Sequence, residues 1–153
     1  MDIRASIIRY CNYQERCHQE VRDKLYELGA HTGEVNQFIA DLIDSGLLNE
    51  ERFAKAYVRG KFRMKQWGRV KIIQGLKQHR ISPYLIQKSL KEISPDDYFG
   101  TALKLANKKW ATLSGSELHK KSRLFRYLYQ RGYENNLIGE VMQLIISDNK
   151  AGF

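Results

Sequence analysis

Few residues in this sequence carry the side chains that catalysis or metal binding requires, and they are scattered. The four histidines are His18, His31, His79 and His119. No two of them stand at the short spacing from which a helix or loop binds a metal ion. The chain also lacks a glycine-rich phosphate loop and the serine turn of a hydrolase. The sequence therefore predicts surface histidines, no catalytic or metal site, and no cofactor.

Two acidic pairs raise the alternative of a metal-dependent nuclease. Glu50 and Glu51 form one pair, and Asp96 and Asp97 form the other. Each pair falls in the first turn of an expected helix, where negative side chains are favoured by the helix dipole. This position explains the pairs without a metal, so we interpret the chain as a non-enzymatic binding protein.

The amino-terminal residues and the cysteines bear on the cellular compartment. The first ten residues include Asp2, Arg4 and Arg9, which makes them too polar for a signal peptide or a membrane span. Cys11 and Cys17 lie six residues apart, so they form no CxxC pair and do not face each other on one helix. We expect reduced, partly buried thiols, a cytoplasmic location and no membrane association.

Positive charge is concentrated in the middle third of the chain. Residues 51–80 carry 10 basic and 1 acidic side chains, whereas residues 1–50 carry 5 and 9. Residues 81–153 carry 11 and 7, and the net charge of the whole chain is +9. Such a concentration is typical of a surface that binds a polyanionic or acidic partner, although surface lysines alone can serve solubility.

Eight of these ten cations lie on one side of an expected helix and in the connection that follows it. We call them, together with one tryptophan, the basic face: Arg52, Lys55, Arg59, Lys61, Arg63, Lys65, Trp67, Arg69 and Lys71. Four phosphate contacts from such a face predict a salt slope of about −3.6, or roughly a 150-fold loss of affinity between 50 and 200 mM salt. Trp67 leaves two interpretations open, since it can stack on a base or fill a partner's pocket, or it can pack the turn.

The elements that must position this face repeat three times along the chain. A shift of about 51 residues aligns six apolar columns. The columns are Ile7, Val58 and Trp110; Val21, Ile72 and Leu124; Leu25, Leu76 and Leu128; Val35, Ile86 and Ile138; Ile39, Leu90 and Met142; Leu42, Ile93 and Ile145. The spacings of 3 and 4 within each unit predict helices, and no alternating pattern predicts a strand.

We therefore predict an all-α fold of three tandem three-helix repeats in an elongated or curved array. The expected repeats span residues 1–48, 49–94 (the basic one) and 95–153. One helix is expected to begin after Asn49, a good capping residue followed by Glu50 and Glu51 in the first turn. Two more are expected to begin at Ser82–Pro83 and Ser94–Pro95, because a capping serine followed by proline is a specific start signal. Residues 114–116 are expected to form a loop inside the third repeat.

Glycines mark expected helix ends. Gly29 and Gly132 occupy equivalent places in the first and third repeats, and Gly46 marks a further end. The second repeat has Arg80 at the equivalent position, which leaves the left-handed conformation open there.

The segment from Leu42 to Ser82 resembles the RecX family of bacterial recombination regulators. Its specific part is the run Gly46–Ala54, GLLNEERFA, followed by the basic helix. The run RGY at residues 131–133, with Ile138 and Met142 after it, is also similar to the closing helices of that family. With the three-repeat pattern, the resemblance covers nearly the whole chain.

The resemblance implies a small cytoplasmic protein that lodges in the groove of the RecA filament on DNA and restrains its ATPase and strand exchange. It implies no catalytic residues. The chain departs from the family pattern at Gln66–Arg69, where a glycine-rich, proline-containing basic turn is usual. We expect a monomer that meets the RecA recombinase filament, and single- or double-stranded DNA, through the basic face. The alternative is a general DNA-binding helical protein that needs no recombinase.

Overall fold

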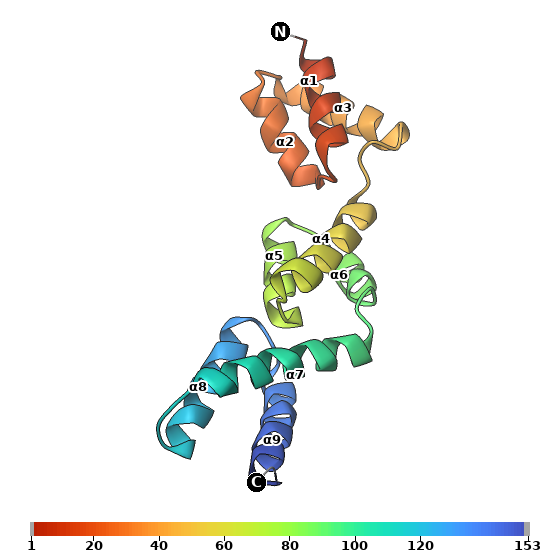
Figure 1. Ribbon diagram of the computed structural model, residues 1–153. Coiled ribbons are helices and arrows are strands. Elements are labelled where there is room, and N and C mark those ends of the chain that lie inside the picture. The colour runs from red at the N-terminus through yellow and green to blue at the C-terminus, as the bar shows by residue number, and fades with distance from the viewer. Residues whose placement is uncertain (1, 152–153) are drawn as a thin grey trace. The chain divides into compact units, whose positions relative to one another are not determined.

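The computed structural model describes residues 2–151, and these residues form nine helices without a strand (Figure 1). The helices are α1 (Ile3–Tyr13), α2 (His18–Glu27), α3 (Thr32–Asp44), α4 (Glu50–Lys65), α5 (Arg69–Gln78), α6 (Pro83–Leu90), α7 (Pro95–Thr112), α8 (Glu117–Gln130) and α9 (Asn135–Ala151). The predicted all-α repeat fold is confirmed, with three helices in each repeat. The connection between α7 and α8 includes residues 114–116, as expected.

The repeated apolar columns form the interior. All of their members are buried except Leu90 and Met142, which are half-buried. Residues spaced 3 and 4 apart lie on one face of a helix, and in each of the three repeats this face is buried in the core. The sequence repeat is therefore a repeat of the packing.

The predicted capping residues begin the helices as expected. The Asn49 side chain accepts a hydrogen bond of 2.9 Å from the backbone N–H of Arg52 at the start of α4. Ser82 accepts a bond of 3.3 Å at the start of α6, and Ser94 accepts one of 3.1 Å from the N–H of Asp97 at the start of α7. Each cap satisfies a backbone donor that has no partner within its helix.

The second helix of each repeat ends in the same way. Gly29 and Gly132 take positive φ angles of 97° and 96°, and Arg80 takes 59°. The residue after each of them donates a backbone hydrogen bond to the carbonyl five positions before it, from Ala30, Ile81 and Tyr133. This is the Schellman end, and the second repeat forms it without glycine.

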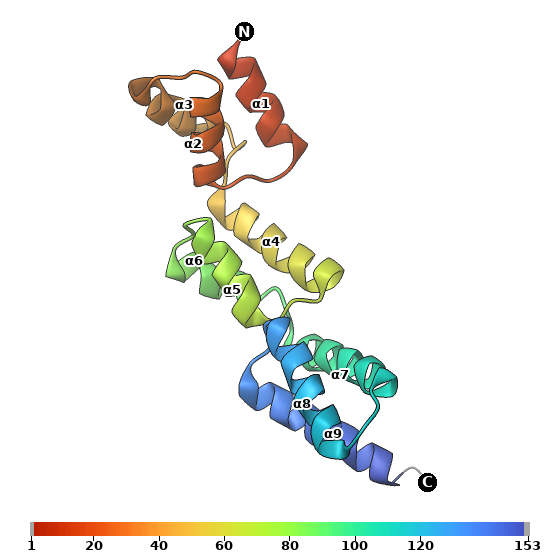
Figure 2. The same cartoon turned by 90° about the vertical axis from the view of Figure 1, so that its left-hand side faces the viewer.

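The contacts divide the described chain into two compact units. The first comprises the residues up to Val58 together with Gly75–Leu90. In it, α2 packs on α1 and α3 around a core that includes Ile7, Leu25 and Val35 (Figure 2).

The rings of Phe53, Tyr57 and His79 also belong to this first unit. The His79 ring centroid lies 5.4 Å from each of the other two, and its Nδ1 lies 2.8 Å from the carbonyl oxygen of Gly75. His79 is half-buried, so the expectation of a surface histidine is wrong there, because its ring supplies apolar area to the packing.

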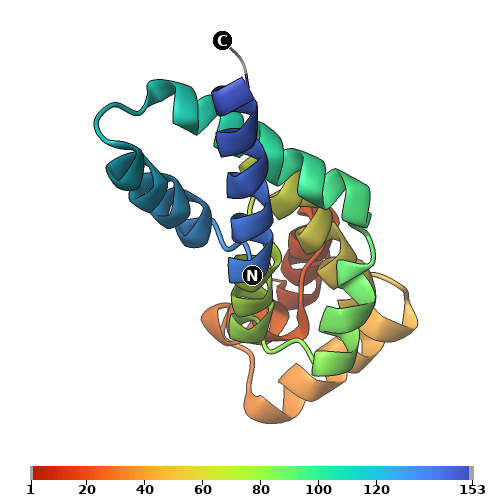
Figure 3. The ribbon, with the colours of Figure 1, turned by 90° about the horizontal axis from the view of Figure 1, so that it is seen from below.

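The second unit comprises Arg59–Gln74 and the described residues from Lys91 onward. In it, α7 packs against α8 and α9, as Figure 3 shows from the carboxyl-terminal side. Tyr98 lies between Phe62 and Tyr133, with ring centroids 6.0 and 5.3 Å away. These three buried rings join the end of α4, the start of α7 and the turn before α9.

Cys11 and Cys17 are free and buried. Cys17 caps the start of α2, where its sulfur accepts a hydrogen bond from the N–H of Glu20, and burial raises the pKa of its thiol to about 12. Within residues 2–151, no cluster of histidine, cysteine or acidic side chains is suited to hold a metal ion. None of the helices described for this chain combines the length and apolarity needed to cross a membrane.

Candidate polyanion-binding surface

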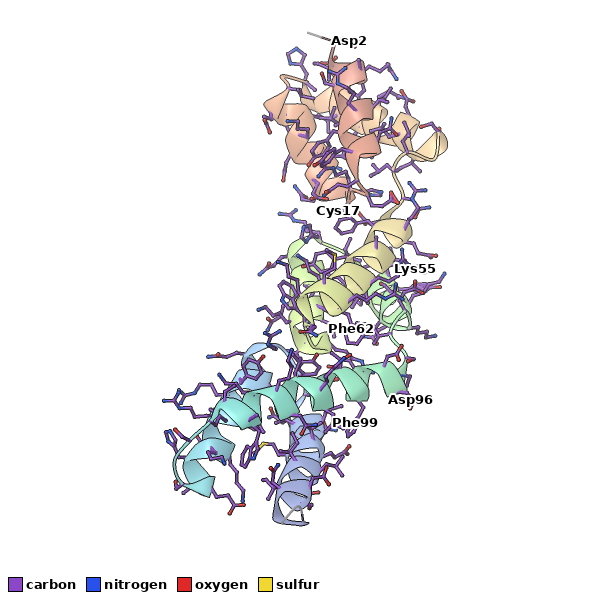
Figure 4. The ribbon with its side chains drawn as sticks, viewed as in Figure 1. Asp2, Cys17, Lys55, Phe62, Asp96 and Phe99 are labelled. Carbon is purple, nitrogen blue, oxygen red and sulfur yellow. The ribbon has the colours of Figure 1, made fainter. Side chains whose placement is uncertain are left out.

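The cations of helix α4 lie on its outer side because its other side is buried in the interior. Phe53, Ala54, Val58 and Phe62 are buried along that side. Lys55 points outward from α4 in Figure 4, where buried Phe62 is also labelled. The helix thus positions the first part of the basic face, and the connection and the first turn of α5 position the rest.

Four cations of the basic face are paired with glutamates. Arg52 pairs with Glu15, Lys55 with Glu51 at 3.2 Å, Arg59 with Glu92, and Arg69 with Glu134 at 3.2 Å. A paired cation holds less charge for a partner, because the nearby carboxylate offsets its field. The main contacts of these four residues are therefore within the molecule.

Glu51 illustrates how far this pairing extends within the first unit. It accepts hydrogen bonds from Lys88 at 2.8 Å and from Lys55, and these bonds lower the pKa of the Glu51 carboxyl. Arg52 also donates a 2.9 Å bond to the carbonyl oxygen of Gly46. Ion pairs and hydrogen bonds thus connect the amino-terminal part of α4 to its neighbours.

Arg69 contacts Tyr98 through both its side chain and its backbone. Its guanidinium lies 3.9 Å from the centroid of the Tyr98 ring, and its backbone N–H donates a 2.8 Å bond to the Tyr98 hydroxyl. That hydroxyl in turn donates to Glu134. Burial raises the pKa of Tyr98 well above its usual range, so the phenol stays protonated and keeps this donor role. A part for Arg69 in binding stays a prediction.

Arg63, Lys65 and Lys71 have no ion pair with any residue that the structure describes. Arg63 and Lys65 are exposed, and Lys71 is half-buried. Arg63 lines a shallow hollow of about 420 Å³ with Asp96 and Asp97 at the start of α7, where Asp96 is labelled in Figure 4. These three cations therefore hold more charge for a partner than the four that are paired with glutamates.

Trp67 lies between two lysines. The Nζ atoms of Lys61 and Lys71 are 4.8 and 4.6 Å from the centroid of its ring, a distance at which cations are attracted to the face of an aromatic ring. Trp67 is half-buried, so it packs in the turn and still has ring surface exposed. Both interpretations of this residue therefore remain compatible with its position.

The turn that contains Trp67 docks on the turn before α9. The N–H of Gly68 donates a 2.7 Å bond to the carbonyl of Arg131, and the N–H of Val70 donates a 2.9 Å bond to the carbonyl of Gly132. A Cβ at position 68 would lie 2.4 Å from the carbonyl atoms of Gly132, so only glycine fits there. The Tyr133 hydroxyl closes the junction with a 2.9 Å bond to the carbonyl of Gln66.

This junction was not predicted. The residues that the sequence analysis overlooked are Tyr98, Glu134 and the contact between Gly68 and Gly132. The only available signal was that RGY at 131–133 and the turn at 66–69 were each distinctive, and nothing in their spacing indicated that they meet. The structure brings the two segments together and thereby holds Lys71 and Trp67 in place.

An all-α chain of three-helix repeats with a cationic segment belongs to the class of helical-repeat proteins. Comparison with known proteins narrows this class. The model of the second three-helix domain of RecX matches residues 49–90, and that of the third domain matches residues 96–142.

Named relatives agree with these matches. "Regulatory protein RecX" of Clostridium perfringens is 30% identical over 146 residues, which cover 94% of this chain and 68% of the relative. The protein of that name from Prosthecochloris aestuarii is 26% identical over 141 residues, covering 92% of this chain and 91% of the relative. The crystal structure of RecX from Lactobacillus salivarius is similar with a TM-score of 0.85 and 25% identity, covering 94% of both chains. The chain belongs to the RecX family, which is a family of regulatory proteins.

Proposed function

We propose that this protein binds the RecA recombinase filament on DNA and inhibits its ATPase, its strand exchange and the recombinational repair that depends on them. The observation that carries the proposal is the unpaired charge of Arg63, Lys65 and Lys71 in a chain of the RecX family. A nucleoprotein filament exposes phosphates along its groove, and cations that are not already neutralised gain the most from such a partner.

In this proposal the protein acts as a cytoplasmic monomer without catalysis. The repeats at 1–48, 49–94 and 95–153 form the array, and the second repeat supplies most of the contact. The paired cations Arg52, Lys55, Arg59 and Arg69 hold the scaffold, and Lys61 and Trp67 border the contact. Regulation then follows from occupancy of the filament, because a bound protein blocks or stiffens the subunits beneath it.

The direct test is the DNA-dependent ATPase of the cognate recombinase as this protein is titrated in. We expect inhibition at well below one molecule per recombinase subunit, and we expect Arg63→Glu with Lys65→Glu to weaken it. The matched control is Arg9→Glu with Lys108→Glu, which makes the same change in net charge at two exposed positions outside the basic face. An unaffected ATPase, or equal losses in both variants, would overturn the proposal.

A general DNA-binding protein is the second candidate. The arrangement of Trp67 between Lys61 and Lys71 favours it, since cations around an aromatic ring suit a nucleic acid as well as a filament. Tight, salt-sensitive binding to bare DNA without any effect on the recombinase would select this candidate.

A further inference from the structure

A hollow of about 750 Å³ lies in the second unit, between α5 and the turn that joins α8 to α9. Its size falls in the range of clefts that hold small molecules and single nucleotides. Val70, Lys71 and Gln74 of α5 line one side, and Tyr129, Gln130 and Asn135 line the other. The hollow adjoins the basic face through Lys71, which belongs to both.

The walls of the hollow combine three kinds of chemistry. Val70 is 42% exposed and Tyr129 is 58% exposed, so both offer apolar surface to a ligand. Gln74, Gln130 and Asn135 are exposed amides, and no hydrogen bond within residues 2–151 occupies their side chains. Lys71 adds a cation without an ion pair at the edge next to Trp67.

The other polar lining groups are already engaged. The Tyr133 hydroxyl donates to the carbonyl of Gln66 at 2.9 Å. The Glu134 carboxylate accepts from Tyr98 and pairs with Arg69 at 3.2 Å, so its negative charge is offset. A ligand in the hollow therefore meets free amides, an aromatic ring and a lysine.

Tyr129 also belongs to an exposed aromatic pair. Its ring lies 5.9 Å from that of Phe125, one turn earlier on α8, and the two planes differ by only 14°. Phe125 is 38% exposed. Exposed aromatic rings beside a basic groove are surfaces on which successive bases of single strands stack.

We propose that this hollow takes an unpaired nucleotide of single-stranded nucleic acid. The base stacks on Tyr129, its edge meets the amides of Gln74, Gln130 and Asn135, and the adjoining phosphate lies at Lys71. Phe125 extends the stacking surface to the next base. The inference rests on the proposed function only through Lys71, and it adds a direct contact to bases that the cationic surface by itself would not make.

A peptide is the less favoured occupant. An amphipathic peptide needs a row of apolar anchor sites, whereas this hollow offers Val70 and Tyr129 among amides and a lysine. Amides in a cleft beside an aromatic ring match the hydrogen-bonding edges of a base better than they match aliphatic side chains.

The test compares two probes of equal length and charge, a fluorescein-labelled oligothymidylate and the corresponding abasic oligonucleotide, by fluorescence anisotropy without recombinase. We expect the wild-type chain to prefer the oligothymidylate, and Tyr129→Ala to lower its affinity by about fivefold to twentyfold while leaving the abasic probe unchanged. Tyr129→Phe should keep the preference, because it keeps the ring.

The matched control is Tyr84→Ala, which removes another exposed aromatic residue, 65% exposed on α6 and outside the hollow. It should leave both affinities unchanged. Equal binding of the two probes by the wild type, or equal losses for both probes in Tyr129→Ala, would overturn the inference. Because the assay contains no recombinase, such a result would leave the ATPase proposal to stand or fall by itself.

Discussion

At the scale of single residues, the three repeats reach one backbone geometry with different side chains. Gly29 and Gly132 adopt positive φ, which glycine does at no steric cost. Arg80 adopts φ 59° at the equivalent place, where its Cβ crowds the following carbonyl. The hydrogen bond from Ile81 to the carbonyl of Leu76, at 3.1 Å, and the burial of Ile81 hold it there. The second repeat thus carries a local strain that the other two avoid.

Replacing Arg80 by glycine should relieve this strain. We expect Arg80→Gly to raise the free energy of unfolding by about 0.5–1 kcal/mol, since the relief is partly offset by the greater freedom of glycine in the unfolded chain. Urea unfolding followed by circular dichroism measures it. Arg80→Ala is the control, because it removes the side chain and keeps the Cβ. An equal gain in Arg80→Ala would show that backbone strain is not the cause.

At Gly68, by contrast, a larger residue should destabilise the protein, because this glycine contacts Gly132 closely. We expect Gly68→Ala to lower the free energy of unfolding by about 1–3 kcal/mol, because its Cβ would meet backbone atoms that cannot rotate away. Gly100→Ala is the matched control, since a Cβ there has no neighbour within 4 Å and position 100 lies inside α7. That control should be neutral or stabilise the protein, as alanine favours helices. A neutral Gly68→Ala would contradict the close approach of the two turns.

At the scale of elements, the sequence predicted the helices well because their signals are local. The apolar spacing and the caps at Asn49, Ser82 and Ser94 involve residues at most a few turns apart. Apart from the pair of Lys55 with Glu51, one turn apart on α4, the division of the basic face into paired and unpaired cations was not predictable in this way. The partners of Arg52 and Arg59 stand 37 and 33 residues away in sequence, so only tertiary packing brings them together.

The same reason explains the missed junction. Arg69 and Glu134 are separated by 65 residues, and Gly68 meets Arg131 and Gly132 across a similar interval. The apolar periodicity of a helix predicts which of its faces is buried. It does not predict which distant turn packs against that helix. The charge of the middle third was visible in the sequence, but its strength at each position depends on these distant carboxylates.

At the scale of the whole molecule, the pairing changes the expected response to salt. If Arg63, Lys65 and Lys71 make the phosphate contacts, affinity for duplex DNA should follow salt with a logarithmic slope of about −2.7, or roughly a 40-fold loss between 50 and 200 mM. Contacts from all eight cations of the basic face would give a slope of about −7. Fluorescence anisotropy over this salt range separates the two, and the steeper slope would contradict the distinction between paired and unpaired cations.

The central claim is that the unpaired cations of the basic face bind the recombinase filament. Its most direct test is the equilibrium binding of the labelled protein to preassembled RecA filaments, for two variants that each lose three positive charges. Arg63→Gln, Lys65→Gln and Lys71→Gln together should weaken binding by about tenfold or more, because they remove unneutralised contacts. Arg52→Gln, Lys55→Gln and Arg59→Gln together should change it by less than about threefold, because the carboxylates of Glu15, Glu51 and Glu92 already offset these charges. Equal losses, or a greater loss in the second variant, would contradict the account.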